Sequence, residues 1–284
     1  MPLAQKHIES IGSAQVKSAI LLASLNTPGI TTIEEMKISR DHTENILSAI
    51  NAEIKIKKMK KNNVITLKGQ KNLNGFNLQI PGDPSSAAPF IILTLLTTGS
   101  KLLIKNVNCN PTRIGFIKIL KKMNANIKIK SYKKRSGEIT GNIVVKSSTL
   151  KPINCSKKLV PFAIDEFPLL FIVSSLIKGK SKWNGIAELR TKEADRIKIM
   201  EIGLNKIGIK TKSTNDSLTI VGNPNLKINK TLRIVPHNDH RIAMTLGIAG
   251  LLAKNVVTVN GAEVVDISYP GFWRDLEFIA YQQH

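Results

Sequence analysis

The chain has 284 residues, 42% of them hydrophobic, which is enough for two folded domains with cores of their own and excludes a disordered chain. Lys and Arg number 42 against 20 Asp and Glu, so the net charge is +22, but the lysines are spread over the whole length and aromatic residues make up only 5%. This pattern disfavours a specific nucleic-acid surface and favours anionic small molecules as partners, with codon bias as a second explanation of the lysine content.

An apolar helical run, a break and a β-branched strand follow one another four times along the chain. The breaks fall at Gly29, Gly99, Gly179 and Asn255, roughly 70 to 80 residues apart. After each strand we expect a polar loop and a second helix, and in the first three copies a further strand. In chain order, the expected first helices lie at 20–25, 90–96, 169–177 and 244–252, the strands at 30–33, 101–104, 182–183 and 256–259, the second helices at 43–52, 112–123, 194–207 and 272–281, and the further strands at 54–56, 127–129 and 209–211.

These repeats predict an α/β (α+β) fold in two domains. A copy of this size cannot bury both its helices and its sheet, so the copies are expected to pack with their helices inward. The Pro- and Gly-rich segment 80–86 separates the first copy from the other three. We therefore expect residues 1–80 to belong to one domain and residues 81–284 to form a second, whose last copy lacks a strand.

The stretch 187–196 carries three cations and three carboxylates between an expected strand at 180–186 and the helix at 194–207. A strand-to-helix loop of this kind offers an oxyanion both side-chain cations and backbone N–H groups. Lys192 and Arg196 are four residues apart, so on a helix they would share one face, with Glu193 and Asp195 turned aside. The arrangement suits a site that holds an anion and moves a proton, and the alternative is a solvated turn held by ion pairs.

Eight motifs appear in the order known from one enzyme family, at 12–19, 39–44, 81–87, 110–113, 164–166, 188–196, 238–244 and 268–272. On these motifs the chain closely resembles the 5-enolpyruvylshikimate-3-phosphate synthases over essentially all its length. The resemblance implies two domains of three βαβαββ units each, forming an inside-out prism. About four of the six units would be present here, namely the last unit of the N-terminal domain and all three of the C-terminal domain, without the strand that the N-terminus normally supplies.

The resemblance also implies an activity and its residues. Enolpyruvyl transferases of this family move the enolpyruvyl group of phosphoenolpyruvate to the 5-hydroxyl of shikimate 3-phosphate, release phosphate, and need no metal or organic cofactor. Asp165 would accept the proton of the 5-hydroxyl, and Glu193 would protonate C3, with its acidity tuned by Lys192 and Arg196. The groups matched to shikimate 3-phosphate are Ser13, Ala14, Gln15, Arg40, Asp165 and Lys192, and those matched to phosphoenolpyruvate are Gln15, Arg196 and Arg241.

Several of these residues also have an ordinary structural explanation. Ser13 and Asp165 each stand where a helix N-cap is expected. Arg241 could form a surface ion pair with Asp239, and Arg40 could be a plain surface arginine.

No metal site is expected. His237 and His240 lack the carboxylate and supporting partners of metal ligands, and Cys109 and Cys155 have no metal-binding spacing. Ile267 stands where some family members have a lysine that contacts phosphoenolpyruvate, which other members also lack.

Three alternatives remain open at this stage. The sister enzyme that transfers enolpyruvyl to UDP-N-acetylglucosamine shares the fold, although the motifs at 13–15 and 238–241 disfavour it. The chain could also be an inactive fragment, or one part of a split pair that needs a separately encoded N-terminal part, rather than a monomer. In isolation we expect no measurable transfer. The apolar runs are too short to cross a bilayer and the first residues do not form a signal peptide, so a cytoplasmic location is expected.

Overall fold

A computed structural model describes residues 4–60, 62–135, 137–226, 232–253 and 257–281 of the chain. Its contacts divide the chain into two compact units. Unit 1 comprises Met1–Pro81 with two later segments, Asn108–Arg113 and Ser131–Gly141, and unit 2 comprises the remainder. The expected break at Asn255 and the first residue of the expected strand, Val256, lie outside the described residues.

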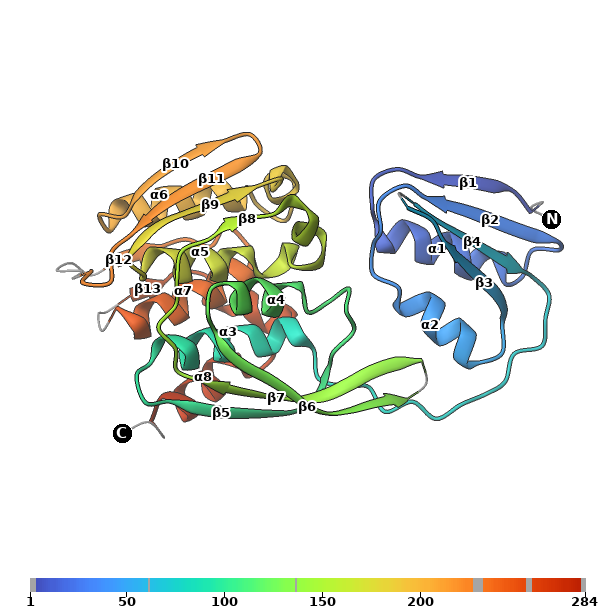
Figure 1. Cartoon of the computed structure of the whole chain (residues 1–284), viewed down its shortest axis with the longest axis horizontal. Coiled ribbons are helices and arrows are strands. Elements are labelled where there is room, and N and C mark those ends of the chain that lie inside the picture. The colour runs from blue at the N-terminus through green and yellow to red at the C-terminus, as the bar shows by residue number, and fades with distance from the viewer. Residues whose placement is uncertain (1–3, 61, 136, 227–231, 254–256, 282–284) are drawn as a thin grey trace. The chain divides into compact units, whose positions relative to one another are not determined.

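Unit 1 is built on a four-stranded sheet with two helices on one face (Figure 1). The elements follow in the order β1 (Lys6–Glu9), α1 (Ala14–Ser24), β2 (Ile30–Glu35), α2 (His42–Ala49), β3 (Glu53–Lys58) and β4 (Asn63–Lys68). The strand order is β1-β2-β4-β3, with β1 parallel to β2 and the other pairs antiparallel. The sheet and helices enclose a small core of Leu21, Ile33, Leu47, Ile65 and Leu67.

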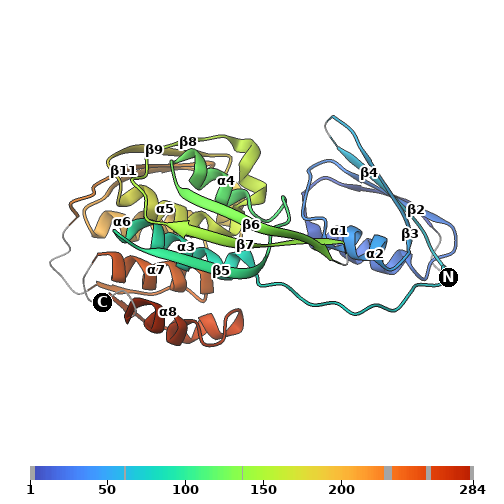
Figure 2. The same ribbon diagram turned by 60° about the horizontal axis from the view of Figure 1, so that its bottom comes forward.

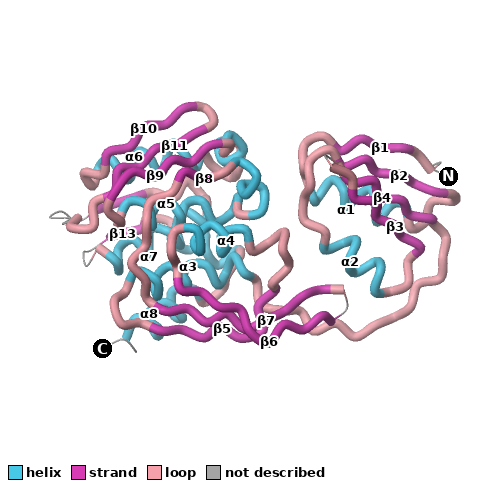
Figure 3. The backbone as a smooth tube through the Cα atoms, viewed as in Figure 1, coloured by secondary structure: helices cyan, strands magenta, loops and turns pink. Residues whose placement is uncertain are grey.

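Unit 2 places its helices inside and its sheets outside. Helices α3 (Pro84–Leu96), α5 (Phe167–Ser175) and α7 (His240–Leu252) contact one another, and every residue of α5 is buried. Figures 1, 2 and 3 show these helices between the sheet of β8–β11 and the sheet of β5–β7. The expected inward packing of the helices is therefore confirmed, since apolar faces that one repeat cannot bury alone are covered by its neighbours.

The strands of unit 2 repeat the connectivity of unit 1. Strand β8 (Asn154–Cys155) is parallel to β9 (Gly179–Asn184), and β11 (Ser217–Gly222) lies between β9 and β10 (Lys210–Thr214), which gives the same order as in unit 1. Strands β5 (Lys101–Asn108), β7 (Glu138–Lys146) and β6 (Asn126–Arg135) form a second sheet, although the ends of these strands within Asn108–Arg113 and Ser131–Gly141 count with unit 1. Strand β12 (Leu232–Ile234) pairs in parallel with β13 (Val257–Val259). The first and third copies are thus βαβαββ units, whereas the second opens with an isolated bridge between Gly82 and Val107 in place of a strand.

The second helices of the copies complete the pattern: α4 (Gly115–Lys122), α6 (Arg196–Lys206) and α8 (Phe272–Tyr281). Short 3₁₀ turns, η1 (Lys157–Phe162), η2 (Ile164–Glu166), η3 (Ala187–Arg190) and η4 (Ala262–Ile267), lie in the loops of unit 2.

Two features of the elements differ from the sequence-based expectation. The opening strands β1, β8 and β12 were not predicted, because they are only two to four residues long, too short to show a reliable period. Helices α1 and α3 begin six residues before the apolar runs that predict them, because their first turns consist of small and polar residues. No helix in the described part of the chain is both long and apolar enough to cross a membrane.

Candidate active site

Arg196 is the central residue of a polar cluster in unit 2. It opens helix α6, and its side chain is only 1% exposed. Its Nε donates to Asp239 Oδ2 at 2.7 Å, and its Nη2 donates to Glu193 Oε2, also at 2.7 Å. A guanidinium held by two carboxylates on one edge is fixed in orientation, so its remaining edge points in a defined direction.

Asp239 links Arg196 to a second helix. It is the N-cap of α7, where its Oδ1 accepts from the backbone N–H groups of Arg241 and Ile242 at 2.9 and 3.2 Å. The same carboxylate is fully buried and binds Arg196 with its other oxygen. Because one side chain serves both purposes, the first turns of α6 and α7 are held together at their N-terminal ends.

Asp165 lies between the two arginines. Its Oδ1 is 3.7 Å from Arg196 Nη1, and its Oδ2 is 3.7 Å from Arg241 Nη2. Both distances exceed hydrogen-bonding length, and Arg196 Nη1 is buried with no hydrogen-bond partner among the described residues. A buried cationic N–H group without an acceptor is costly, so this edge of Arg196 is suited to an anionic ligand.

The charges of this cluster do not favour anion binding by number alone. Arg196 and Arg241 contribute two positive charges, while Asp165, Glu193 and Asp239 contribute three negative ones when ionised. A ligand with several negative charges therefore requires further cations or a proton in addition to this set. Glu193 is the most exposed of the three carboxylates, with 48% of its side chain accessible. Its position beside Arg196 and its contact with solvent suit a group that exchanges protons.

Lys192 does not occupy the expected position. Helix α6 begins only at Arg196, with Asp195 as N-cap, so Lys192 precedes the helix and shares no helical face with Arg196. The ammonium of Lys192 pairs with Glu188 instead. Glu193 was expected to turn aside from Arg196, but its Oε2 accepts from Arg196 at 2.7 Å, so that expectation is wrong. Asp195 instead accepts from the backbone N–H of Lys198 at 2.9 Å and from Arg190 at 2.8 Å. Ion pairs of the kind that the solvated-turn alternative assumes are therefore present at Arg190 and Lys192.

Two structural alternatives are resolved for the remaining residues of unit 2. The side chain of Arg241 pairs with Asp165, whereas Asp239 binds Arg196 and the backbone, so the expected Arg241–Asp239 surface pair is wrong. Asp165 is not an N-cap: it lies in the 3₁₀ turn η2, and the N-cap position of α5 belongs to Glu166.

In unit 1 three of the predicted substrate-binding residues, Ser13, Ala14 and Gln15, lie at the start of α1. Ser13 is its N-cap, and Ser13 Oγ accepts from the backbone N–H of Val16 at 3.3 Å, which confirms the capping role. The hydroxyl hydrogen of Ser13 can still be donated to a ligand. Helical geometry leaves the N–H groups of Ala14 and Gln15 without an acceptor inside the helix, so this end of α1 can donate several hydrogen bonds to an anion.

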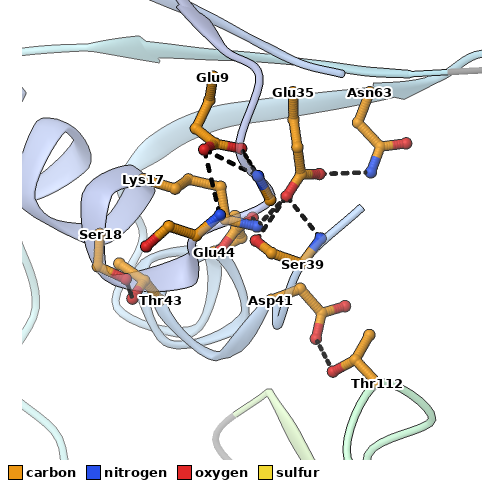
Figure 4. A network of polar contacts seen from close by, with 12 residues as sticks. Glu9, Lys17, Ser18, Glu35, Ser39, Asp41, Thr43, Glu44, Asn63 and Thr112 are labelled. Atoms are coloured by element: carbon orange, nitrogen blue, oxygen red, sulfur yellow. Dashed lines mark hydrogen bonds and ion pairs between the residues drawn. The ribbon is translucent and has the colours of Figure 1, made fainter. Parts of the chain in front are cut away.

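Arg40 lies in the loop between β2 and α2, and both of its neighbours in the chain are anchored. Ser39 donates from its backbone N and its Oγ to Glu35 Oε1 at 2.9 and 2.7 Å. On the other side, Asp41 Oδ1 accepts from Asn110 Nδ2 at 2.7 Å and from Thr112 Oγ1 at 3.3 Å. The backbone at Arg40 is therefore held from both directions (Figure 4).

The two histidines near the cluster show no ligand set. His240 opens α7, and burial, reinforced by the nearby Arg241, lowers the pKa of its imidazole. Among the described residues no group of three His, Cys, Asp or Glu side chains could hold a metal ion. Ile267 is exposed at the end of η4.

Fold and site together define an α/β protein built of packed repeats of helices and strands, with the buried Arg196 and the partly buried Arg241 in the first turns of α6 and α7. The family model described as EPSP synthase (3-phosphoshikimate 1-carboxyvinyltransferase) matches residues 5–276. The chain belongs to this family.

Relatives and solved structures agree with the family model. The chain is 44% identical over 270 residues to a 3-phosphoshikimate 1-carboxyvinyltransferase of Petrotoga mobilis, a match that covers 95% of this chain and 61% of that protein. It is 42% identical to the enzyme of the same name from Carboxydothermus hydrogenoformans, covering 96% of this chain and 62% of the relative. A structure of EPSP synthase from Acinetobacter baumannii superimposes with a TM-score of 0.86 at 39% identity, covering 95% of this chain and 61% of that one. The chain thus spans about 60% of the length of these relatives.

Proposed function

We propose that this chain supplies two sets of substrate-binding groups for enolpyruvyl transfer from phosphoenolpyruvate to shikimate 3-phosphate, a step towards chorismate and the aromatic amino acids. One observation carries the proposal: Arg196 is buried and held by Asp239 and Glu193, yet its Nη1 edge has no hydrogen-bond partner among the described residues. Membership of the EPSP synthase family supports phosphoenolpyruvate as the anion that binds at this edge.

In the proposed reaction, the 5-hydroxyl oxygen of shikimate 3-phosphate bonds to C2 of phosphoenolpyruvate while C3 takes up a proton. The bond from C2 to the phosphate oxygen then breaks, C3 loses a proton, and inorganic phosphate leaves. In unit 2, Arg196 and Arg241 bind phosphoenolpyruvate, Asp165 accepts the proton of the 5-hydroxyl, and Glu193 donates to C3. Fixed guanidinium groups stabilise the charge that develops during the addition without having to reorganise.

Shikimate 3-phosphate is assigned to Ser13, Ala14, Gln15 and Arg40 of unit 1, and to Asp165 and Lys192 of unit 2. Gln15 also takes part in binding phosphoenolpyruvate. Lys192 reaches a substrate only by leaving Glu188, and because that ion pair is partly exposed, the exchange of partners costs little. No metal or organic cofactor takes part in the proposed reaction.

We also propose how the chain corresponds to the domains of the family. Residues 1–80 represent the last unit of the N-terminal domain, and residues 81–284 represent the three units of the C-terminal domain. The reaction is that of the whole family enzyme, so this chain works together with the remaining family sequence, and the complete enzyme is cytoplasmic.

Complementation tests this function. The 284-residue chain is combined with the part of the Petrotoga mobilis relative that lies outside the matched region, and phosphate release from phosphoenolpyruvate is measured. We expect release with shikimate 3-phosphate and none with UDP-N-acetylglucosamine, and we expect the chain on its own to be inactive. The matched control replaces Arg196 with Gln in the same mixture. Phosphate release with UDP-N-acetylglucosamine, or no release with shikimate 3-phosphate, would contradict the proposal.

A further inference from the structure

Lys17 is a completely buried cation in the second turn of α1 in unit 1. Its Nζ lies 2.7 Å from Glu35 Oε1, at the end of β2, and 2.7 Å from Glu44 Oε1, in the first turn of α2. All three side chains are at most 2% exposed. One ammonium group therefore connects the first helix, the second strand and the second helix of the unit (Figure 4).

The carboxylates of Glu35 and Glu44 differ in their hydrogen-bond donors. Burial alone would raise the pKa of the Glu35 carboxyl, but hydrogen bonds from Lys17 and Ser39 bring it below its usual value. Glu35 also accepts from Asn63 Nδ2 at 2.9 Å. Burial raises the pKa of the Glu44 carboxyl despite Lys17, and Glu44 Oε2 has no hydrogen-bond partner among the described residues. Lys17 is thus indispensable to Glu44, whereas Glu35 keeps other donors.

Glu35 links Lys17 to the loop that carries Arg40. The carboxylate oxygen that binds Lys17 is the one that accepts both the backbone N–H and the hydroxyl of Ser39. Ser39 is adjacent to Arg40, so two contacts through Glu35 and one peptide bond join the Lys17 ammonium to the backbone of Arg40. At the other end, the backbone N–H of Lys17 bonds to Ser13 O at 3.1 Å. Lys17 is therefore linked both to Ser13 and to the residue before Arg40.

A separate carboxylate holds the loop before α1. Glu9, at the end of β1, accepts from the backbone N–H groups of Ile11, Gly12 and Ser13 at 2.9 to 3.1 Å. Strand β1 pairs with β2 so that Glu9 lies opposite Glu35. The two loops are consequently fixed by two neighbouring carboxylates, and only the Glu35 loop depends on Lys17.

We infer that Lys17 is a positioning residue for shikimate 3-phosphate: bridged to Glu35 and Glu44, it sets the distance between Ser13 at the start of α1 and Arg40 in the loop after β2. The inference rests on the proposed function, which assigns Ser13 and Arg40 to that substrate. Lys17 has no exposed surface and cannot touch the substrate itself. A fixed spacing of the two phosphate-binding groups lowers the ordering cost of binding.

The decisive variant is the double substitution Lys17→Met/Glu44→Gln. It removes one positive and one negative charge, so the net charge of the buried cluster stays the same and Glu35 keeps its bonds to Ser39 and Asn63. Amide hydrogen exchange at Ser39 reports on the Arg40 loop, and exchange at Gly12 and Ser13 serves as an internal control because Glu9 holds those amides. Binding of shikimate 3-phosphate is followed by NMR titration at the amides of Ala14 and Gln15.

We expect the double variant to exchange the Ser39 amide at least 10-fold faster and to bind shikimate 3-phosphate at least 10-fold more weakly, with Gly12 and Ser13 unchanged. Leu21→Ala, a buried substitution one turn further along the same helix, controls for a general loss of stability. Among folded molecules it should change the Ser39 exchange rate and the affinity for shikimate 3-phosphate by no more than twofold. Equal binding by the wild type and the double variant overturns the inference, as does equal weakening by Leu21→Ala.

Two further outcomes separate this inference from the proposed function. If the wild-type chain does not bind shikimate 3-phosphate, the proposed assignment of the substrate fails, and the Ser39 exchange rate still decides whether Lys17 fixes the loop. If the double variant does not fold, Glu44→Asp replaces it, because this change keeps all charges and shortens one arm of the bridge. Binding by Glu44→Asp that is at least threefold weaker supports the inference, and unchanged binding overturns it.

Discussion

Asp239 binds the buried guanidinium of Arg196 at 2.7 Å with one oxygen while its other oxygen caps helix α7. Capping fixes the carboxylate, and the fixed carboxylate in turn fixes Arg196. The orientation of Arg196 is therefore tied to the N-cap of a helix 43 residues further along the chain.

Asp239→Asn tests this link. An asparagine still caps α7, but it leaves the buried Arg196 with one charge partner fewer, so we expect a loss of about 3 kcal/mol or more in the free energy of unfolding. Chemical denaturation measures it. Asp195→Asn is the matched control, because Asp195 caps α6 and pairs with the partly exposed Arg190; it should cost about 1 kcal/mol or less. Equal losses in the two variants would contradict the assigned role of Asp239.

Arg196→Ala is expected to lower kcat/KM of the complemented enzyme by roughly 10²-fold or more, because a charge-assisted contact made in the transition state is lost. Arg196→Lys should not restore activity, since an ammonium group cannot bind Asp239 and Glu193 and also present a free edge to the substrate. Steady-state phosphate release measures both variants. An unchanged kcat/KM in Arg196→Ala would place the anion site elsewhere.

Asp165→Asn should separate binding from chemistry. Asp165 faces Arg196 and Arg241 at 3.7 Å each, so its negative charge opposes an incoming anion and competes for both cations. Removing that charge should leave the KM for phosphoenolpyruvate unchanged or lower it, while the loss of the proton acceptor lowers kcat by roughly 10²-fold or more. Initial rates at varied phosphoenolpyruvate give both constants. A raised KM with normal kcat would show that Asp165 binds rather than accepts a proton.

Glu138 in unit 1 predicts a pH dependence of stability. Burial favours the neutral form of this side chain, but hydrogen bonds from His42 and Asn108 lower its pKa to about 2. A carboxyl with a depressed pKa stabilises the fold above its unfolded value near 4.5, and that contribution disappears as the pH falls towards 2. Glu138→Gln should therefore cost roughly 2 to 3 kcal/mol at pH 7 and much less near pH 2.

Denaturant unfolding at several pH values checks this prediction. Glu34→Gln serves as control, since Glu34 pairs with the largely exposed Lys6. A cost for Glu138→Gln that does not depend on pH would contradict it.

Local sequence was sufficient for much of the fold. Apolar runs of helical period and β-branched segments identify the first helices and the strands that follow them, because burial of one face imposes these periods on any chain. The order of the motifs likewise identifies the family. The short strands β1, β8 and β12 escaped prediction because two to four residues cannot express a period, and their pairing is decided by partners distant in the chain.

In the candidate site, too, the sequence predicted some features and the structure decided others. The sequence by itself selected Arg196, Arg241, Asp165 and Glu193, and the structure brings these four together in unit 2. It also placed Lys192 on the face of Arg196, which is wrong because α6 begins one residue after the Asp195 cap, a boundary that side-chain hydrogen bonding decides. Asp239 was considered only as a partner of Arg241, although an aspartate directly before an apolar helical run is the signal for an N-cap.

What the sequence determined, then, is the repeat, the family and the identity of the charged residues, since these depend on residue type and spacing alone. Only the tertiary structure decided the partners of those charges. Ion pairs such as Arg196–Asp239 and Lys17–Glu35 join residues 43 and 18 positions apart. Such pairs form only because folding brings the ends of separate elements together and removes the water that would otherwise solvate each charge.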